Sequence, residues 1–264
     1  YIFVFMKKTN PIGLFDSGIG GTSIWKEVHT LLPNENTIYL ADSKNAPYGL
    51  KSKDEIIQLS CKNTELLLEE NCKIIVVACN TATTNAIKEL RAKYDVPFIG
   101  IEPAIKPAAI QSQTQTIGIL ATKGTLNSSL FHENVAKHPD VKIIEQIGHG
   151  LVQLIENGDL DSPEMKKLLE SYLLPMVKKN IDYLVLGCSH YPYLIPQIKK
   201  IIPSSIKIID SGEAVAKQTK KILEELQLIN PSIGNSTQVF YTNSNPEVLK
   251  KIVKPQESVF YKDF

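Results

Sequence analysis

Two cysteines of this chain stand in similar surroundings, far apart in the sequence. Cys79 lies in the run IIVVACNT (residues 74–81), and Cys188 lies in the run YLVLGCSH (residues 183–190). In each run an apolar stretch leads to a thiol that two polar residues follow. Thiols are acid/base groups, and two of them facing one another across a cleft could move a proton from one face of a carbon to the other. The pair therefore predicts inversion of a stereocentre.

The composition excludes several other kinds of partner. The chain has 264 residues, a net charge of +1 and 22% charged residues, which suits one large domain or two of ordinary size. Because basic residues are scattered, we expect no nucleic acid and no anionic membrane surface as a partner. No apolar stretch approaches the roughly 20 residues of a membrane span. We therefore expect a cytoplasmic protein that binds a small molecule.

The remaining cysteines and the first residues indicate a reducing compartment. The apolar residues 1–5 precede the positive charge of Lys7 and Lys8 and lack a cleavage pattern, so we predict Met6 as the true start. Without a secretory signal, the four cysteines are expected to be reduced. Cys61 and Cys72 lack polar neighbours of the same kind, and we assign them to packing. Because no C-x-x-C pair or close His cluster occurs, no metal is predicted.

Short β-branched runs alternate with helical patterns, and this predicts an α/β fold. Helical periodicity marks residues 51–71 and 163–180. We expect two similar domains, formed by residues 6–102 plus 213–264 and by residues 103–212, each an open, mostly parallel sheet flanked by helices. Ligands of such sheets bind beyond the carboxyl ends of the strands, here in a cleft between the domains. Nine strands are predicted: residues 11–15, 37–42, 73–79, 97–102, 116–122, 141–148, 183–188, 206–211 and 238–243.

A glycine-rich turn, DSGIGG at residues 16–21, follows the first predicted strand. Its backbone N–H groups could hold an anion at the start of a helix. A dinucleotide fingerprint is opposed by Ser23, which replaces the third glycine, and by the carboxylate of Asp16 near any pyrophosphate. A carboxylate ligand fits better, with Asp16 addressing an ammonium group or a thiol. A plain turn with Asp16 and Ser17 as helix caps is the alternative.

The residues that follow each cysteine suit acid/base work. A helix is predicted to begin near Ala82, and its macrodipole favours the thiolate of Cys79 over the thiol. Asn80 and Thr81 add an amide and a hydroxyl beside that thiol. His190 can exchange a proton near neutral pH beside Cys188. No lysine occupies a comparable strand end, so a Schiff-base cofactor is not expected.

Five motifs together resemble one known family. They are FDSGIGG (15–21), NAPYG (45–49), ACNTA (78–82), ATKGT (121–125) and GCSHYP (187–192). In this order they resemble the glutamate racemases of the aspartate/glutamate racemase superfamily. The resemblance extends from about Pro11 to about Gly212. The family has Thr where this chain has Ser189, a change that keeps the hydroxyl.

The resemblance implies a cofactor-independent enzyme that converts L-glutamate to D-glutamate for peptidoglycan, and a homodimer. By the same similarity, Cys79 takes the proton from D-glutamate and Cys188 takes it from L-glutamate. Asp16 would assist Cys79, whereas His190 and Glu156 would assist Cys188. The substrate would be bound by Asp16, Ser17, Tyr48, Gly49, Asn80, Thr81, Ser189 and His190, with Thr122 and Thr125 as further candidates.

Two rival functions stay open on the sequence alone. A two-domain binding protein or sensor would show the same glycine-rich turn but would close on an amino acid without chemistry. A racemase acting on aspartate or another amino acid would use the same two thiols. Loss of optical rotation from pure L-glutamate separates an enzyme from a binder.

Overall fold

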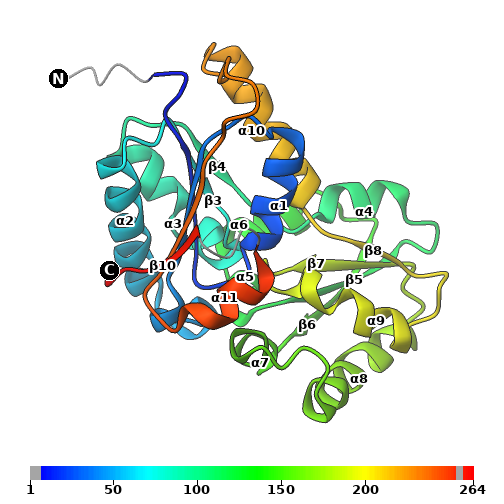
Figure 1. Ribbon diagram of the computed structural model, residues 1–264. Coiled ribbons are helices and arrows are strands. Elements are labelled where there is room, and N and C mark those ends of the chain that lie inside the picture. The colour runs from blue at the N-terminus through cyan, green and yellow to red at the C-terminus, as the bar shows by residue number, and fades with distance from the viewer. Residues whose placement is uncertain (1–6, 254–257) are drawn as a thin grey trace.

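A computed structural model describes residues 7–253 and 258–264, so the predicted start at Met6 lies outside it. The predicted α/β class with two parallel sheets is confirmed (Figure 1). The first sheet has six parallel strands in the order β10-β9-β2-β1-β3-β4. Their bounds are β1 Ile12–Asp16, β2 Thr37–Ala41, β3 Ile74–Val77, β4 Phe98–Gly100, β9 Gln238–Thr242 and β10 Val259–Tyr261.

The second sheet has four parallel strands in the order β6-β5-β7-β8. Their bounds are β5 Thr116–Ala121, β6 Lys142–Ile147, β7 Tyr183–Gly187 and β8 Lys207–Ile209. All nine predicted strands form, and β10 is an addition that sequence reasoning missed. This strand pairs only three residues with β9 at the edge of the sheet, too short a run to show a period.

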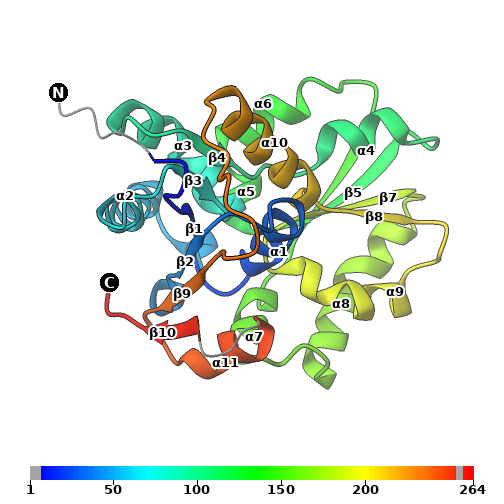
Figure 2. The same cartoon turned by 45° about the horizontal axis from the view of Figure 1, so that its top comes forward.

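Helices cover both faces of each sheet, which explains why the strands are apolar on consecutive residues. In β3, Ile74 and Val76 face α1 (Thr22–Leu31) and α10 (Gly212–Glu225), whereas Ile75 and Val77 face α2 (Lys53–Glu69) and α3 (Asn80–Lys93). Figure 2 shows α4 on one side of the second sheet and α8 and α9 on the other. The helices are α1 Thr22–Leu31, α2 Lys53–Glu69, α3 Asn80–Lys93, α4 Ile105–Gln111, α5 Lys123–Leu126, α6 Ser129–Val135, α7 Leu151–Asn157, α8 Pro163–Val177, α9 Ile195–Ile201, α10 Gly212–Glu225 and α11 Pro246–Ile252.

The two sheets repeat one strand order. In each, the first strand of the unit, β1 or β5, lies between the second and the third, and the fourth follows the third. The chain therefore leaves β1 and β3, and likewise β5 and β7, toward opposite faces. Such a switch point opens a crevice at the carboxyl ends of these strands. Cys79 follows β3 and Cys188 follows β7, so the two thiols occupy equivalent places in the two units.

The strands assign the two predicted domains to separate sheets. β1 to β4 and the late strands β9 and β10 share the first sheet, and β5 to β8 form the second. α10, which follows the second sheet in the chain, packs against α1. The boundaries at residues 102 and 213 stay a prediction. In the part of the chain that the structure describes, every helix is too short or too polar to span a bilayer.

One buried ion pair ties the first sheet to the chain that returns to it. Lys73 Nζ lies 2.5 Å from Glu35 Oε2, with both side chains almost fully buried. The same ammonium donates to the Leu228 carbonyl at 2.8 Å, and Glu35 Oε1 accepts from the Asn230 N–H at 2.8 Å. The pair therefore fixes the segment between α10 and β9, which the first sheet needs for its last two strands.

Removing one partner of this pair is expected to destabilise the fold strongly. Lys73→Met leaves Glu35 as an unpaired buried charge, which costs about 3–5 kcal/mol of unfolding free energy. The matched control is Lys93→Met, because Lys93 pairs with Glu65 at 3.0 Å where both side chains are half exposed; its loss should be much smaller, since an exposed ion pair contributes little to stability. Urea unfolding of both variants measures the difference, and equal losses would contradict the assignment.

Candidate active site

Cys79 joins the end of β3 to the start of α3. Its side chain caps that helix, because Sγ accepts the Ala82 N–H at 3.4 Å. The predicted helix start near Ala82 was two residues late, since α3 begins at Asn80. The thiol is buried and contacts Ser17 Oγ at 3.7 Å. Cys79 therefore faces the turn that follows β1, as the shared switch point requires.

Cys188 occupies the matching place after β7. Its Sγ lies 3.8 Å from His190 Nδ1, and the next residues form the short 3-10 helix Tyr191–Leu194. The thiol is 5% exposed and His190 is 1% exposed. The ring nitrogen is thus held beside the sulfur in a site from which water is excluded.

Asp16 connects the two thiol environments. Its carboxylate is fully buried and accepts the Gly21 N–H at 2.7 Å. The Ser189 hydroxyl lies 3.3 Å from both carboxylate oxygens, and His190 Nδ1 lies 3.8 Å from Oδ2. Ser17 donates to the same carboxylate at 3.4 Å. A continuous polar chain therefore runs from Cys79 through Ser17 and Asp16 to His190 and Cys188.

Glu156, on α7, closes this chain from the side of the second sheet. Its Oε1 lies 2.5 Å from His190 Nε2 and accepts the Ile19 N–H at 2.7 Å. A Cβ on Gly18 would collide with this carboxylate, and a Cβ on Gly20 would collide with the imidazole. These glycines are needed so that side chains of the second unit can approach the turn.

The turn itself differs from the expectation of free N–H groups awaiting an anion. Ile19 N–H donates to Glu156, and Gly21 N–H donates to Asp16. The alternative of a capped helix is also wrong in detail, because α1 begins only at Thr22 and no side chain caps it. The N–H groups of this turn therefore bind the carboxylates of Glu156 and Asp16 and not that of a ligand.

Burial and neighbouring charges set the protonation of the central groups. Burial opposes a charged His190, yet bonds to Cys188 and Glu156 and the charges of Asp16 and Glu156 raise its pKa well above the usual value. The raised pKa favours a proton between Nε2 and Glu156 Oε1, which lie 2.5 Å apart, although the Gly20 N–H also points at Nε2 from 3.3 Å. Burial also raises the pKa of Asp16, against the opposing effects of His190 and the Gly21 N–H. The site thus holds a positive imidazole between two acidic side chains.

The helix start was expected to lower the pKa of Cys79, but burial and the charge of Asp16 have the larger, opposite effect. Burial first, and then the charge of Asp16, raise the pKa of Cys79 well above its ordinary value, although the Ala82 N–H lowers it. A hydrogen bond at a helix terminus favours the thiolate, but a fully buried sulfur beside a carboxylate loses more than it gains. Cys79 therefore holds its proton in this arrangement.

The other predicted binding residues fall into two groups. The hydroxyls of Thr81, Thr122 and Thr125 form one cluster, with Thr81 Oγ1 2.8 Å from Thr122 Oγ1 and 3.3 Å from Thr125 Oγ1. Gly49 lies against Thr122, where a Cβ would collide. The Tyr48 hydroxyl instead donates to Asp42 at 2.5 Å, within the first unit. Asn80 follows Cys79, and its buried Oδ1 has no hydrogen-bond partner among the described residues.

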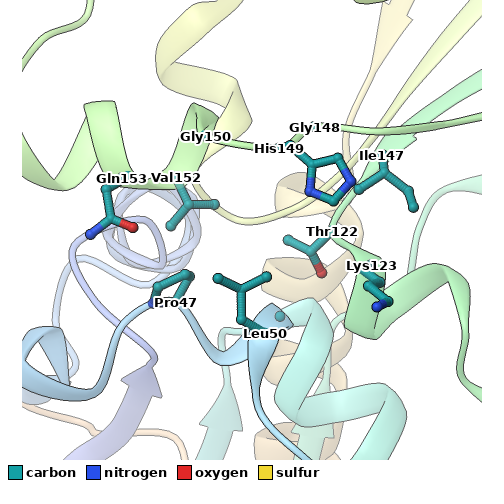
Figure 3. A pocket seen from close by; sticks show the side chains of 11 residues that line it. Pro47, Leu50, Thr122, Lys123, Ile147, Gly148, His149, Gly150, Val152 and Gln153 are labelled. Atoms are coloured by element: carbon teal, nitrogen blue, oxygen red, sulfur yellow. The ribbon is translucent and has the colours of Figure 1, made fainter.

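A cavity of about 80 Å³ opens beside the threonine cluster, between the loop before α2 and the start of α7 (Figure 3). Thr122 lines the cavity and belongs to the cluster. Neither cysteine lines the cavity, whose walls are Pro47, Gly49, Leu50, Thr122, Lys123, Ile147, Gly148, His149, Gly150, Val152 and Gln153. It therefore lies at the mouth between the two units. No three His, Cys, Asp or Glu side chains among the described residues are grouped to hold a metal ion.

Sequence reasoning missed the residues that join the units beside the site. Ser43 donates to Glu156 Oε2 at 2.8 Å, and Ser23 donates to the Ser189 carbonyl at 2.8 Å. The Thr22 hydroxyl lies 2.5 Å from the Tyr193 hydroxyl. Ser43 directly follows Asp42 at the end of a predicted strand, and this position could have marked it as a site residue. Nothing local in the sequence marks Ser23 or Thr22.

This fold and site match one family of known proteins. The profile of the Asp/Glu/hydantoin racemase family matches residues 20–219. The chain belongs to this family, and it is an isomerase. A glutamate racemase of Pseudomonas entomophila (strain L48) is 43% identical over 249 residues, which cover 94% of this chain and 94% of the relative. One of Herpetosiphon aurantiacus is 41% identical over 246 residues, or 93% of this chain and 97% of the relative.

Solved structures agree with these relatives. A glutamate racemase isoform from Bacillus anthracis superposes with a TM-score of 0.86 at 29% identity, over 97% of this chain and 98% of that chain. The Escherichia coli glutamate racemase, solved with L-glutamate and the activator UDP-MurNAc-Ala, gives a TM-score of 0.85 at 31% identity, over 96% and 98% of the two chains. The resemblance that the motifs predicted is confirmed.

The raised pKa of His190 makes a prediction for stability against pH. Because the folded state binds the proton more tightly than the unfolded state, His190 stabilises the fold fully below about pH 6.5 and less as the pH rises toward its folded pKa. Over this range the stabilising contribution of His190 therefore falls as the pH rises. Urea unfolding across this range should show the fall in the wild type and a flatter profile in His190→Asn. An unchanged slope in the variant would exclude a charged His190.

Proposed function

We propose that this chain interconverts L-glutamate and D-glutamate with two thiols and no cofactor. The substrate is supported by the glutamate racemases that match over nearly the whole chain. The mechanism is supported by one observation above all, the polar chain that joins Cys79 to Cys188 through Asp16 and His190. Thiols from equivalent places in two facing units suit attack on opposite faces of one carbon.

The environments of the thiols give them complementary roles. His190 Nδ1 lies 3.8 Å from Cys188 Sγ, where the imidazole can take up and return the proton of that thiol. Cys79, whose pKa is raised, carries the proton to be given. Cys188 therefore takes the α-proton of L-glutamate, and the Cys79 S–H bond breaks as its proton joins the opposite face of the carbon. In the reverse direction Cys79 first passes its proton to Asp16 and then takes the α-proton of D-glutamate, while Cys188, protonated by His190, gives its proton to the opposite face of the carbon.

The remaining polar groups suit the charges of the substrate. The buried Asn80 Oδ1 can accept from the ammonium group, because an unpaired buried acceptor is costly. The hydroxyls of Thr81, Thr122 and Thr125 can donate to a carboxylate. Donors directed at the α-carboxylate also stabilise carbanion character when the proton leaves. We assign further contacts to Ser17, Tyr48, Gly49, Ser189 and Asp16.

The biological setting follows from this reaction. We infer that the product D-glutamate supplies peptidoglycan synthesis and thereby cell-wall biogenesis and cell shape, and that the enzyme acts in the cytoplasm as a homodimer. The domain boundaries proposed with it are residues 6–102 plus 213–264 and residues 103–212. Sedimentation of the purified protein tests the dimer, and growth of a deletion strain with and without D-glutamate tests the supply.

Circular dichroism of purified protein tests the reaction directly. L-glutamate, D-glutamate and L-aspartate are followed in parallel with no cofactor added. The signals of both glutamate enantiomers should decay to zero, whereas that of L-aspartate should persist. Unchanged glutamate signals would leave a binding protein, and decay of the aspartate signal alone would assign the other substrate.

Replacing either thiol of the pair should abolish turnover. Cys79→Ala and Cys188→Ala are each expected to reduce kcat at least about a thousandfold, because each removes one of the two acid/base groups. Cys61→Ala is the matched control, since Cys61 lies within α2 away from the polar chain. Calorimetric binding of D-glutamate shows that the variants keep a folded site. Near-normal turnover in either variant would reject the two-base mechanism.

A further inference from the structure

Ser43 is the first residue of a loop that touches both units of the fold. It begins the 3-10 turn Ser43–Asn45 after β2, in the first unit. Its hydroxyl donates to Glu156 Oε2 at 2.8 Å, across to α7 in the second unit. At the other end of the loop, Gly49 lies against Thr122 of the second unit. The loop therefore meets the second unit at both ends.

This loop is held firmly from within the first unit. Asp42 accepts from Asn45 Nδ2 at 2.7 Å, from the Tyr48 hydroxyl at 2.5 Å and from Asn243 Nδ2 at 2.5 Å. The Asn243 side chain in turn accepts the Lys44 N–H at 2.9 Å. Because Lys44 is the residue after Ser43, the backbone on both sides of Ser43 is fixed. The hydroxyl therefore reaches Glu156 from a rigid base.

Glu156 uses its two oxygens for different partners. Oε1 lies between His190 Nε2 at 2.5 Å and the Ile19 N–H at 2.7 Å, and Oε2 accepts from Ser43. The side chain is 11% exposed, so water cannot fully replace the Ser43 hydroxyl. Loss of that donor frees one end of the carboxylate to turn. The oxygen that fixes the imidazole beside Cys188 then turns with it.

We propose that Ser43 is a positioning residue for the Cys188 half of the reaction, acting through Glu156 and His190. This inference rests on the proposed racemisation of glutamate. Ser43 touches none of the reacting groups. It fixes the carboxylate that orients His190, so its loss slows proton transfer at Cys188 more than at Cys79.

The test compares Ser43→Ala with the wild type in both directions. A hydrogen bond to a charged group predicts a loss in kcat/KM of about tenfold, equal for the two enantiomers because the equilibrium constant is fixed. Substrates deuterated at the α-carbon show which of the two proton transfers, that at Cys188 or that at Cys79, has been slowed. The isotope effect should grow with L-glutamate, whose C–D bond Cys188 breaks, and shrink with D-glutamate, whose C–D bond Cys79 breaks.

Three further variants make the experiment specific. Ser43→Thr keeps the hydroxyl and should restore most of the activity. Ser171→Ala is the control and should behave as the wild type, because this exposed serine on α8 donates to no described residue but Leu168, whose carbonyl accepts. In a Glu156→Gln background the loss from Ser43→Ala should shrink, because a neutral acceptor makes the weaker bond.

The outcomes separate this inference from the reaction on which it depends. A wild-type protein that leaves both glutamate enantiomers unchanged would overturn the proposed function. A racemising wild type with an unaffected Ser43→Ala variant would overturn the positioning role alone. An isotope effect that grows with D-glutamate instead would place Ser43 on the Cys79 side and would equally overturn it, as would full additivity with Glu156→Gln.

Discussion

The imidazole of His190 is bonded to one carboxylate and lies close to another, and the two come from different units of the fold. Asp16 ends β1 in the first sheet, and Glu156 stands on α7 beside the second. All three side chains are buried or nearly so, where a charge without a partner is expensive. Because the positive ring needs its acidic neighbours, the two units are held in one relative position. The contacts of His190 with Asp16 and Glu156 therefore also fix the positions of Cys79 and Cys188.

The glycine-rich turn is shaped by the same requirement. A side chain at Gly18 or Gly20 would fill the space that Glu156 and His190 occupy. The pattern that first suggested anion binding therefore serves close approach between protein groups. The same contact between the units explains why Ser23 stands where a dinucleotide fingerprint would have glycine. Its hydroxyl donates to the Ser189 carbonyl and steadies the backbone next to Cys188.

The sequence predicted what is local and missed what depends on contact between the units. Cys79, Cys188, Asp16 and His190 follow apolar strands, and parallel strands bring their carboxyl ends together. Glu156 was placed by family resemblance alone, because its partner Ser43 lies 113 residues away. The raised pKa of Cys79 was missed for a related reason. A helix start is visible in the sequence, whereas burial beside Asp16 is visible only in the fold.

The repeated strand order explains why the thiols are equivalent in position but unequal in chemistry. The same third-strand end carries Cys79 in one unit and Cys188 in the other. Asp16 and Ser17 border the first thiol, whereas His190 borders the second. Burial and the acidic neighbour raise the pKa of Cys79 and keep that sulfur protonated. A symmetric pair would leave both sulfurs in one state, but inversion needs a base on one face and an acid on the other. The neighbours of the two thiols therefore differ in charge, which suits the different roles proposed for them.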